Sequence, residues 1–316
     1  MLIYFTPNTA LNAMADDCFA LTASAAHFID VGPCADGQRF LHISVVHAFC
    51  QTVCDALKSM PDTVIVICPH DDSASSLRNA ALLYGAYLLL CEDETITDVA
   101  NNVQNSFDAA AGSHHAAKLI DASIADAWRA LHRAKALNWI AAPDCDGAPA
   151  LDMDMAAHYA LPANGGLRVL VPGRLLSFPP PASLPAGQPW ADAAPAGAEP
   201  GRRFSGGFLA ALLSDLGVSA VVCLGRTGGG DAAAFGACGV DVHDLGLDAR
   251  RPALLRGMDR LLSLARSAPG AVAVCGWGAD GAGAAGRECV GTLGAAWLMA
   301  EADFDAGSAE AWVGMA

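Results

Sequence analysis

The residues that decide the fold are 271–301, AVAVCGWGADGAGAAGRECVGTLGAAWLMAE. The apolar run 271–275 predicts a buried strand, and the glycine-rich residues after it predict a loop with few side chains. An apolar helix is expected from about Val290. The N–H groups of such a loop and the N-terminus of the next helix both attract an anion. This order of segments therefore predicts a loop of the kind that binds phosphate.

Three kinds of phosphate loop can be compared with this segment. Residues 276–281, GWGADG, match the dinucleotide fingerprint G-x-G-x-x-G, but no second strand with an acidic residue follows the helix in this sequence. A Walker loop requires G-K-[ST] after its glycines, which is absent. The third kind is the cysteine-phosphatase loop, H-C-x-x-G-x-x-R-[ST]-G, in which a thiolate attacks phosphorus and an arginine six residues later holds the phosphate oxygens.

Composition places limits on the class of protein. The chain has 316 residues, of which 53% are apolar, and a mean hydropathy of +0.35, which predicts two domains with buried cores. No apolar run reaches the roughly 18 residues of a membrane span, and residues 1–5 lack the basic region of a signal peptide. We therefore expect an intracellular protein with no membrane partner.

The net charge of −15, from 18 basic and 33 acidic residues, disfavours nucleic acid and anionic membranes as partners. Basic segments of other proteins are the more plausible partners. The eleven cysteines show no C-x-x-C spacing, so we expect neither a disulfide framework, nor a metal site, nor a cofactor. Cys50 and Cys54 lie four residues apart on one helical face and are expected to be buried small apolar residues.

The first half of the chain alternates strands and helices. Strands are predicted at 2–5, 27–31 and 63–67, and helices at 43–60, 77–90, 96–103 and 122–137, with 93–95 and Asp121 at helix N-termini. This pattern predicts an α/β domain that ends near Ala142. Its own strand-to-loop step, 67–73, contains Pro69, Asp71 and Asp72 after Cys68 and offers no cation for phosphate, so we expect it to be inert.

The second half begins with a connecting segment, 143–166. Two short strands around a Pro-Gly turn are predicted at 167–178, a surface loop at 179–203, a helix at 208–216 and a strand at 218–224. The motif GRTG at 225–228 is expected to be a strand-to-helix turn. Arg226 follows Cys223 by only three residues, which is too few for a phosphatase loop.

Seven stretches, taken together and in order, carry a resemblance to a known family: 79–87, 152–159, 171–178, 217–222, 243–245, 270–274 and 309–312. The chain resembles the cell division cycle fourteen family of mitotic-exit dual-specificity phosphatases. The resemblance implies an α/β fold with two tandem phosphatase-like domains, each a central sheet flanked by helices. The implied domains are a non-catalytic one at 1–142, a linker at 143–166 and a second domain at 167–316 with a shortened C-terminus. The second domain would carry the nucleophile, the arginine and a general-acid aspartate.

The catalytic positions depart from the pattern of the family. Aligned from the strand, Cys275 takes the place of the family's histidine and Gly276 that of its nucleophilic cysteine. Aligned from the helix, Cys289 takes the place of the arginine, and Arg287 comes two residues early. Asp248 resembles the general acid but could equally cap the helix expected near Pro252. None of the eleven cysteines has an arginine six residues later, so no catalytic residue is expected.

The sequence therefore predicts a catalytically inactive phosphatase homologue. Such a pseudophosphatase would act as a scaffold or structural component that binds protein, for example in a cytoskeletal or ciliary assembly, in the cytoplasm or on the cytoskeleton. One alternative is an active dual-specificity phosphatase that uses Cys275, with Arg287 folded over the loop. A weaker alternative is a nucleotide- or metabolite-binding protein that uses the glycine-rich loop. We expect that phosphate does not occupy this loop and that Arg287 points away from its centre. Trp277 is expected to pack under its own loop, and the alternative is that it anchors the loop in a partner.

Overall fold

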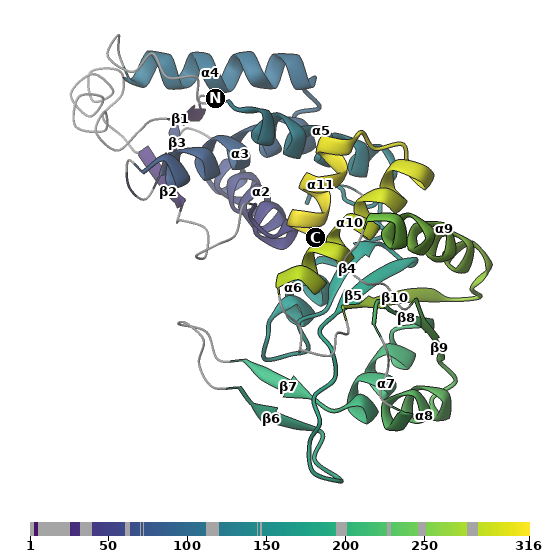
Figure 1. Ribbon diagram of the computed structural model, residues 1–316. Helices are drawn as coiled ribbons and strands as arrows, with labels where there is room; N and C mark the ends of the chain where they lie inside the picture. The colour runs from purple at the N-terminus through teal and green to yellow at the C-terminus, as the bar shows by residue number, and fades with distance from the viewer. Residues whose placement is uncertain are drawn as a thin grey trace. The chain divides into compact units, whose positions relative to one another are not determined.

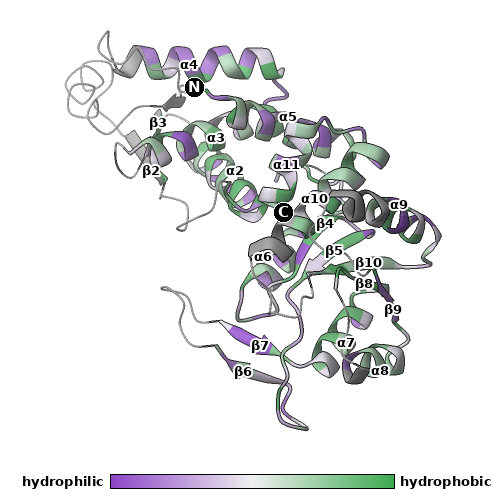
Figure 2. Ribbon diagram, in the orientation of Figure 1, coloured by the Kyte–Doolittle hydropathy of each residue, from purple (hydrophilic) through white to green (hydrophobic). Residues whose placement is uncertain are grey.

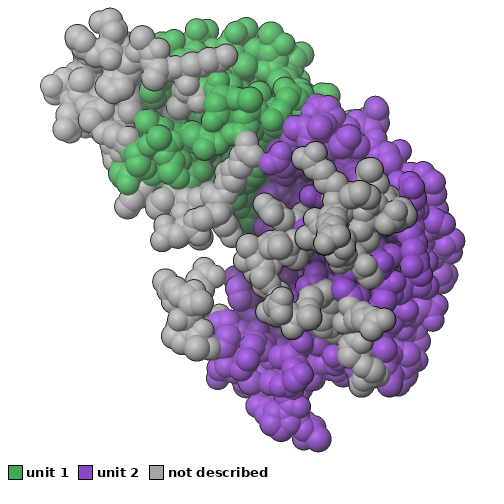
Figure 3. All heavy atoms as spheres, in the orientation of Figure 1, with its two compact units in different colours: residues 1–149, 315 green, residues 150–314, 316 purple. Residues whose placement is uncertain are grey.

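The computed structural model describes residues 3–5, 26–31, 40–60, 64–69, 71, 73–111, 120–143, 145, 147–193, 201–225, 229–245, 251–276 and 284–316. By their internal contacts the residues divide into two compact units (Figures 1 and 3). The first comprises 1–149 and Met315, and the second comprises 150–314 and Ala316. The division falls within the predicted connecting segment 143–166, of which residues 150–166 belong to the second unit.

The first unit contains a parallel sheet with the described order β1-β3-β2. Its strands are β1 (Ile3–Phe5), β2 (Ala26–Val31) and β3 (Val64–Pro69). Its helices are α2 (Ile43–Ser59), α3 (Ala74–Leu90), α4 (Ile96–Ala111) and α5 (Ala122–Ala136). Every residue of 79–90 in α3 is buried, and α3 contacts each of the other three helices. A helix that is apolar on all sides belongs inside a core, so α3 is the centre of this unit.

Trp128 of α5 lies against the backbone of α3. Its side chain is fully buried, and its indole Nε1 donates a hydrogen bond to the Leu82 carbonyl at 3.1 Å. The ring also lies directly over Gly85, where a Cβ atom would overlap it. The two helices can therefore approach this closely only because residue 85 has no side chain.

Replacing this glycine tests the packing. We expect Gly85→Ala to lower the free energy of unfolding by about 1–3 kcal/mol, because the new methyl group forces the Trp128 ring to move. Gly236→Ala, in an exposed helical position with open space around it, is the matched control and should be neutral or stabilising by up to about 1 kcal/mol. Urea titration of both variants provides the measurement. Equal losses would contradict the close-packing argument.

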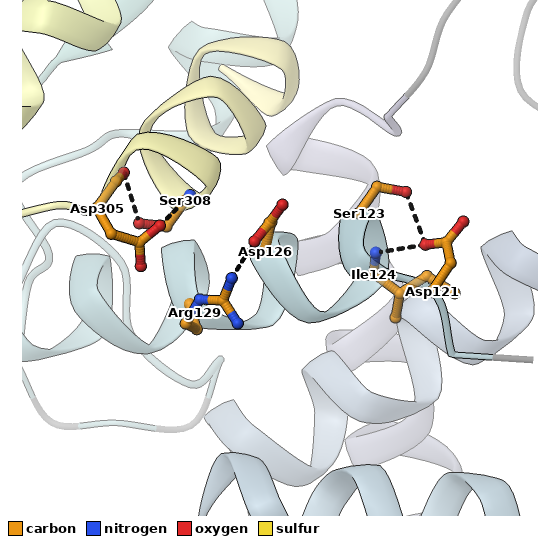
Figure 4. Close-up of polar contacts among 7 residues, drawn as sticks. All are labelled: Asp121, Ser123, Ile124, Asp126, Arg129, Asp305 and Ser308. Carbon is orange, nitrogen blue, oxygen red and sulfur yellow. Dashed lines mark hydrogen bonds and ion pairs between the residues drawn. The ribbon is translucent and has the colours of Figure 1, made fainter.

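Asp121 caps the N-terminus of α5 (Figure 4). Its Oδ1 accepts hydrogen bonds from the Ile124 N–H at 3.0 Å and the Ser123 hydroxyl at 2.7 Å, and Arg78 Nε lies 3.4 Å from Oδ2. Burial by itself would raise the pKa of Asp121, but these hydrogen bonds and the Arg78 charge together hold it below its ordinary value. The ionised carboxylate is thus the form that stabilises the folded state.

This cap should depend on pH. We expect Asp121→Ala to lower the free energy of unfolding by about 1 kcal/mol at neutral pH. A lowered folded-state pKa gives stability that is present above the unfolded value, about 3.9, so the difference from wild type should shrink as pH falls below 4. Asp126→Ala, which removes a surface ion pair with Arg129 one turn along α5, should cost less, about 0.5 kcal/mol. Urea titrations between pH 3 and 7 measure the loss of stability in each variant. A loss for Asp121→Ala that stays the same across this pH range would contradict this account.

The second unit contains a mixed sheet with strand order β4-β5-β10-β8-β9. Its strands are β4 (Arg168–Val171), β5 (Leu175–Phe178), β8 (Val218–Cys223), β9 (Asp241–Asp244) and β10 (Ala271–Cys275). Only β4 runs antiparallel to its neighbour. The expected α/β class, with a central sheet flanked by helices, is confirmed.

Helices cover both faces of this sheet. On one face, α7 (Gly206–Asp215) contacts α8 (Gly229–Ala237), and on the other α9 (Arg251–Ser267) contacts α10 (Ala284–Glu301) (Figure 1). Two further helices, α6 (Met153–Ala160) and α11 (Ala306–Met315), complete the described helices of the unit. No helix in the described ranges is both long and apolar enough to cross a bilayer.

Most of the predicted elements are confirmed, and three differ. The helix expected from about Val290 begins at Ala284, because alanines favour helix strongly enough to extend it through Gly286. The helix predicted at 96–103 continues to Ala111. The surface loop predicted at 179–203 contains an antiparallel pair, β6 (Trp190–Asp192) and β7 (Arg202–Phe204). Figure 2 shows the hydrophilic residues of this pair, in contrast to the hydrophobic α2 and α3.

Candidate functional site

The candidate site lies where β10 ends. All five residues of this strand are buried, and Cys275 pairs in register with Phe178 of β5 and Cys223 of β8. Because β10 is hydrogen-bonded on both sides, its position is fixed. Gly276 is half-buried and is the first residue beyond the sheet.

The topology favours ligand binding at this edge. The chain leaves β8 for α8 on one face of the sheet and leaves β10 for α10 on the opposite face (Figure 1). In α/β sheets, ligands bind outside the carboxyl ends of strands at such a switch point. The segments that follow the two strands, 224–230 and 276–283, are both rich in glycine. The carboxyl ends of β8 and β10 are therefore the place where this unit would bind an anion.

The side chain of Cys275 does not face that edge. Successive side chains of a strand point to opposite faces of the sheet, so Cys275 shares its face with Ala271 and Ala273. All three pack in the apolar cluster that contains Leu209 of α7 and Phe235 of α8. Cys275 has no exposed surface. Burial raises the pKa of its thiol, and the neighbouring Cys223 and Asp231 raise it further. The thiol is therefore protonated at neutral pH, whereas nucleophilic attack needs a thiolate.

The other positions singled out in the sequence lie beyond the strand. The backbone of Arg287 is in the first turn of α10, and its side chain is outside the described residues. Cys289 is half-buried on the same helix. Asp248 and the loop 277–283, with Trp277 and Asp280, also lie outside the described residues. The structure thus places Cys275 and Gly276 at the strand end and Arg287 and Cys289 at the start of the next helix.

Asp231 is a polar group near Cys275 that sequence reasoning missed. It lies in the first turn of α8, and burial raises the pKa of its carboxyl group. Its carboxylate lies so close to Gly206, the first residue of α7, that a Cβ atom there would overlap it. Two features of the sequence could have indicated this contact: the Gly206-Gly207 pair, and the acidic residue that follows the glycines after β8.

An open groove adjoins Asp231. It has a volume of about 670 Å³ and is lined by residues 182–189 and 205–208, Asp231 and Ala234. The segment 182–189 belongs to the stretch that the sequence predicts as a surface loop, and it forms one wall of the groove. The groove offers a concave surface with the Asp231 carboxyl group as a polar feature.

The residues at and after the end of β3, which correspond in the first unit to those after β10, have a structural role. Cys68 is buried near the end of β3. Asp71 Oδ1 accepts hydrogen bonds from the Ser73 N–H at 3.1 Å and the Ser73 hydroxyl at 2.5 Å, and Ser73 in turn caps α3. These polar residues stabilise the start of the central helix.

Neither a metal site nor a known relative assists the assignment. Among the residues that the structure describes, no three His, Cys, Asp or Glu side chains are arranged to hold a metal ion. No model of a known protein family and no curated protein matches this chain. The resemblance to phosphatases therefore depends on the sequence stretches quoted above.

The burial of Cys275 predicts low reactivity toward thiol reagents. In the native protein, we expect iodoacetamide to modify Cys275 at least about tenfold more slowly than the exposed Cys145, because its thiol is inaccessible and protonated. Peptide mass spectrometry over time measures both rates in one sample, and denatured protein provides the control for complete labelling. Equal rates at pH 7 would show that Cys275 is accessible.

Proposed function

We propose that this chain is a catalytically inactive homologue of the dual-specificity phosphatases that functions by binding protein. The observation that carries the proposal is the orientation of Cys275 at the end of β10. Its thiol packs among apolar side chains on the α7–α8 face, whereas α10, which carries Arg287, covers the opposite face. A nucleophile and a phosphate-binding arginine have to meet on the same anion.

The position after the strand supports the same conclusion. In the resembled family the nucleophilic cysteine would stand where this chain has Gly276, which has no side chain to attack phosphorus. Asp231, beside Cys275, adds a negative charge that disfavours the thiolate form of Cys275. The fold is thus retained without the groups that perform the reaction. A scaffold or structural role, as in a cytoskeletal or ciliary assembly, fits such a chain, and its acidic charge favours basic protein partners.

One observation favours the alternative, an active phosphatase that uses Cys275. Since α10 begins at Ala284, only residues 276–283 separate it from β10, fewer than the sequence suggests. Arg287 consequently lies in the first helical turn, where a cation can bind an anion held at the helix N-terminus. This arrangement would also suit the weaker alternative, a phosphate-bearing nucleotide or metabolite.

An activity assay separates the first two candidates. We expect the purified chain to hydrolyse para-nitrophenyl phosphate only at the background rate, and Cys275→Ser to leave that rate unchanged, because no placed thiolate is available. Cys289→Ser is the matched control on the other side of the loop. Turnover that vanadate inhibits and that Cys275→Ser abolishes would establish the active-enzyme alternative. Tight vanadate binding without turnover, lost in Arg287→Ala, would point to a retained anion site.

A further inference from the structure

Three cysteines of the first unit converge at one place. Cys50 and Cys54 lie one turn apart on α2, and Cys91 is the C-cap residue of α3. The Sγ atoms of Cys54 and Cys91 are 3.8 Å apart, and the Cys91 thiol also interacts with that of Cys50. Cys50 is buried as the sequence predicts, whereas Cys54 and Cys91 are only half-buried. A solvent-borne reagent can therefore reach the latter two.

The end of α3 is held firmly in place, which fixes Cys91. The Cys91 N–H donates to the Tyr87 carbonyl at 2.9 Å. Lys135 Nζ donates to the carbonyl oxygens of Leu89 at 2.9 Å and Leu90 at 2.8 Å, and it also pairs with Asp93. Because α2 packs against α3, the two half-buried thiols stay close together in the folded protein.

We propose that Cys54 and Cys91 form a reversible disulfide that joins α2 to the end of α3. The sulfur atoms, now 3.8 Å apart, would have to approach to about 2.05 Å, a movement that a change of side-chain rotamer can largely supply. A metal site is the other use of clustered thiols, but the described residues contain no group arranged to bind one. The neighbouring Cys50 thiol and burial raise the pKa of Cys91, so little of its thiolate is present at neutral pH and its exchange with a disulfide is slow.

The reaction is a thiol–disulfide exchange with a small disulfide such as oxidised glutathione. The thiolate of one cysteine attacks the glutathione disulfide, forms a mixed disulfide and releases one glutathione thiolate. The thiolate of the second cysteine attacks the protein sulfur of the mixed disulfide and releases the second glutathione thiolate. The two protein thiols lose two electrons and two protons, and oxidised glutathione is reduced to two molecules of glutathione.

The test maps the disulfide in the full-length chain. The reduced protein is treated with oxidised glutathione, remaining thiols are alkylated, and tryptic peptides are analysed by mass spectrometry. We expect a link between peptides 40–58 and 79–118, and peptide fragmentation to place it on Cys54 rather than Cys50. Dithiothreitol should remove the link, and a non-reducing gel should show that it forms within one chain.

Matched variants assign the partners independently. Cys50→Ala should keep the link, whereas Cys54→Ser and Cys91→Ser should each abolish it, with circular dichroism confirming that each variant is folded. A link from Cys91 to Cys50 in the wild-type protein would overturn the proposal. So would the absence of any link under conditions in which the exposed Cys145 is fully glutathionylated. Wild-type mapping alone decides the question if a variant fails to fold.

Discussion

The hydrogen bonding of β10 on both sides is the constraint on which the second unit depends. A strand between two parallel neighbours must be apolar throughout, and Ala271–Cys275 is fully buried. Its alternation then fixes the face toward which each side chain points. Since Cys275 falls on the α7–α8 face, the residue that ends the strand contributes to the core, and the chain reaches the sheet edge at Gly276.

The sequence predicted the elements whose signal is local. The runs AVAVC and VSAVVC are short, continuous and apolar, as central strands require, and Asp121 precedes a helix as a cap should. It failed where a local signal was ambiguous. The glycines around 281–286 masked the helix propensity of Ala284 and Ala285. The β6–β7 pair was missed because strands of three residues carry little sequence pattern. Within this pair, Arg202 stacks over the Trp190 ring, with its Cζ atom 4.2 Å from the ring centroid.

The candidate site could be predicted only in part, for a related reason. The apolar run in the sequence identified Cys275 as the last residue of the strand and Gly276 as the first residue beyond it. The approach of Asp231 to Cys275 depends on how α8 packs against α7 and β9, and the spacing of residues along the chain does not reveal that packing. The proximity of Cys54 to Cys91 likewise arises from the packing of α2 against α3 across 37 residues of sequence. Contacts of this kind require the folded chain.

The buried position of α3 explains why its end carries so much chemistry. Its last carbonyl groups have no partner within the helix, and inside a core they cannot be left to water. Lys135 reaches from α5 to satisfy two of them, and its charge is balanced by Asp93, which adopts a left-handed backbone with φ of 56°. This capping ties α5 to α3 on one side. A bond between Cys54 and Cys91 would tie α2 to the same point, so the helices around α3 could then open only together.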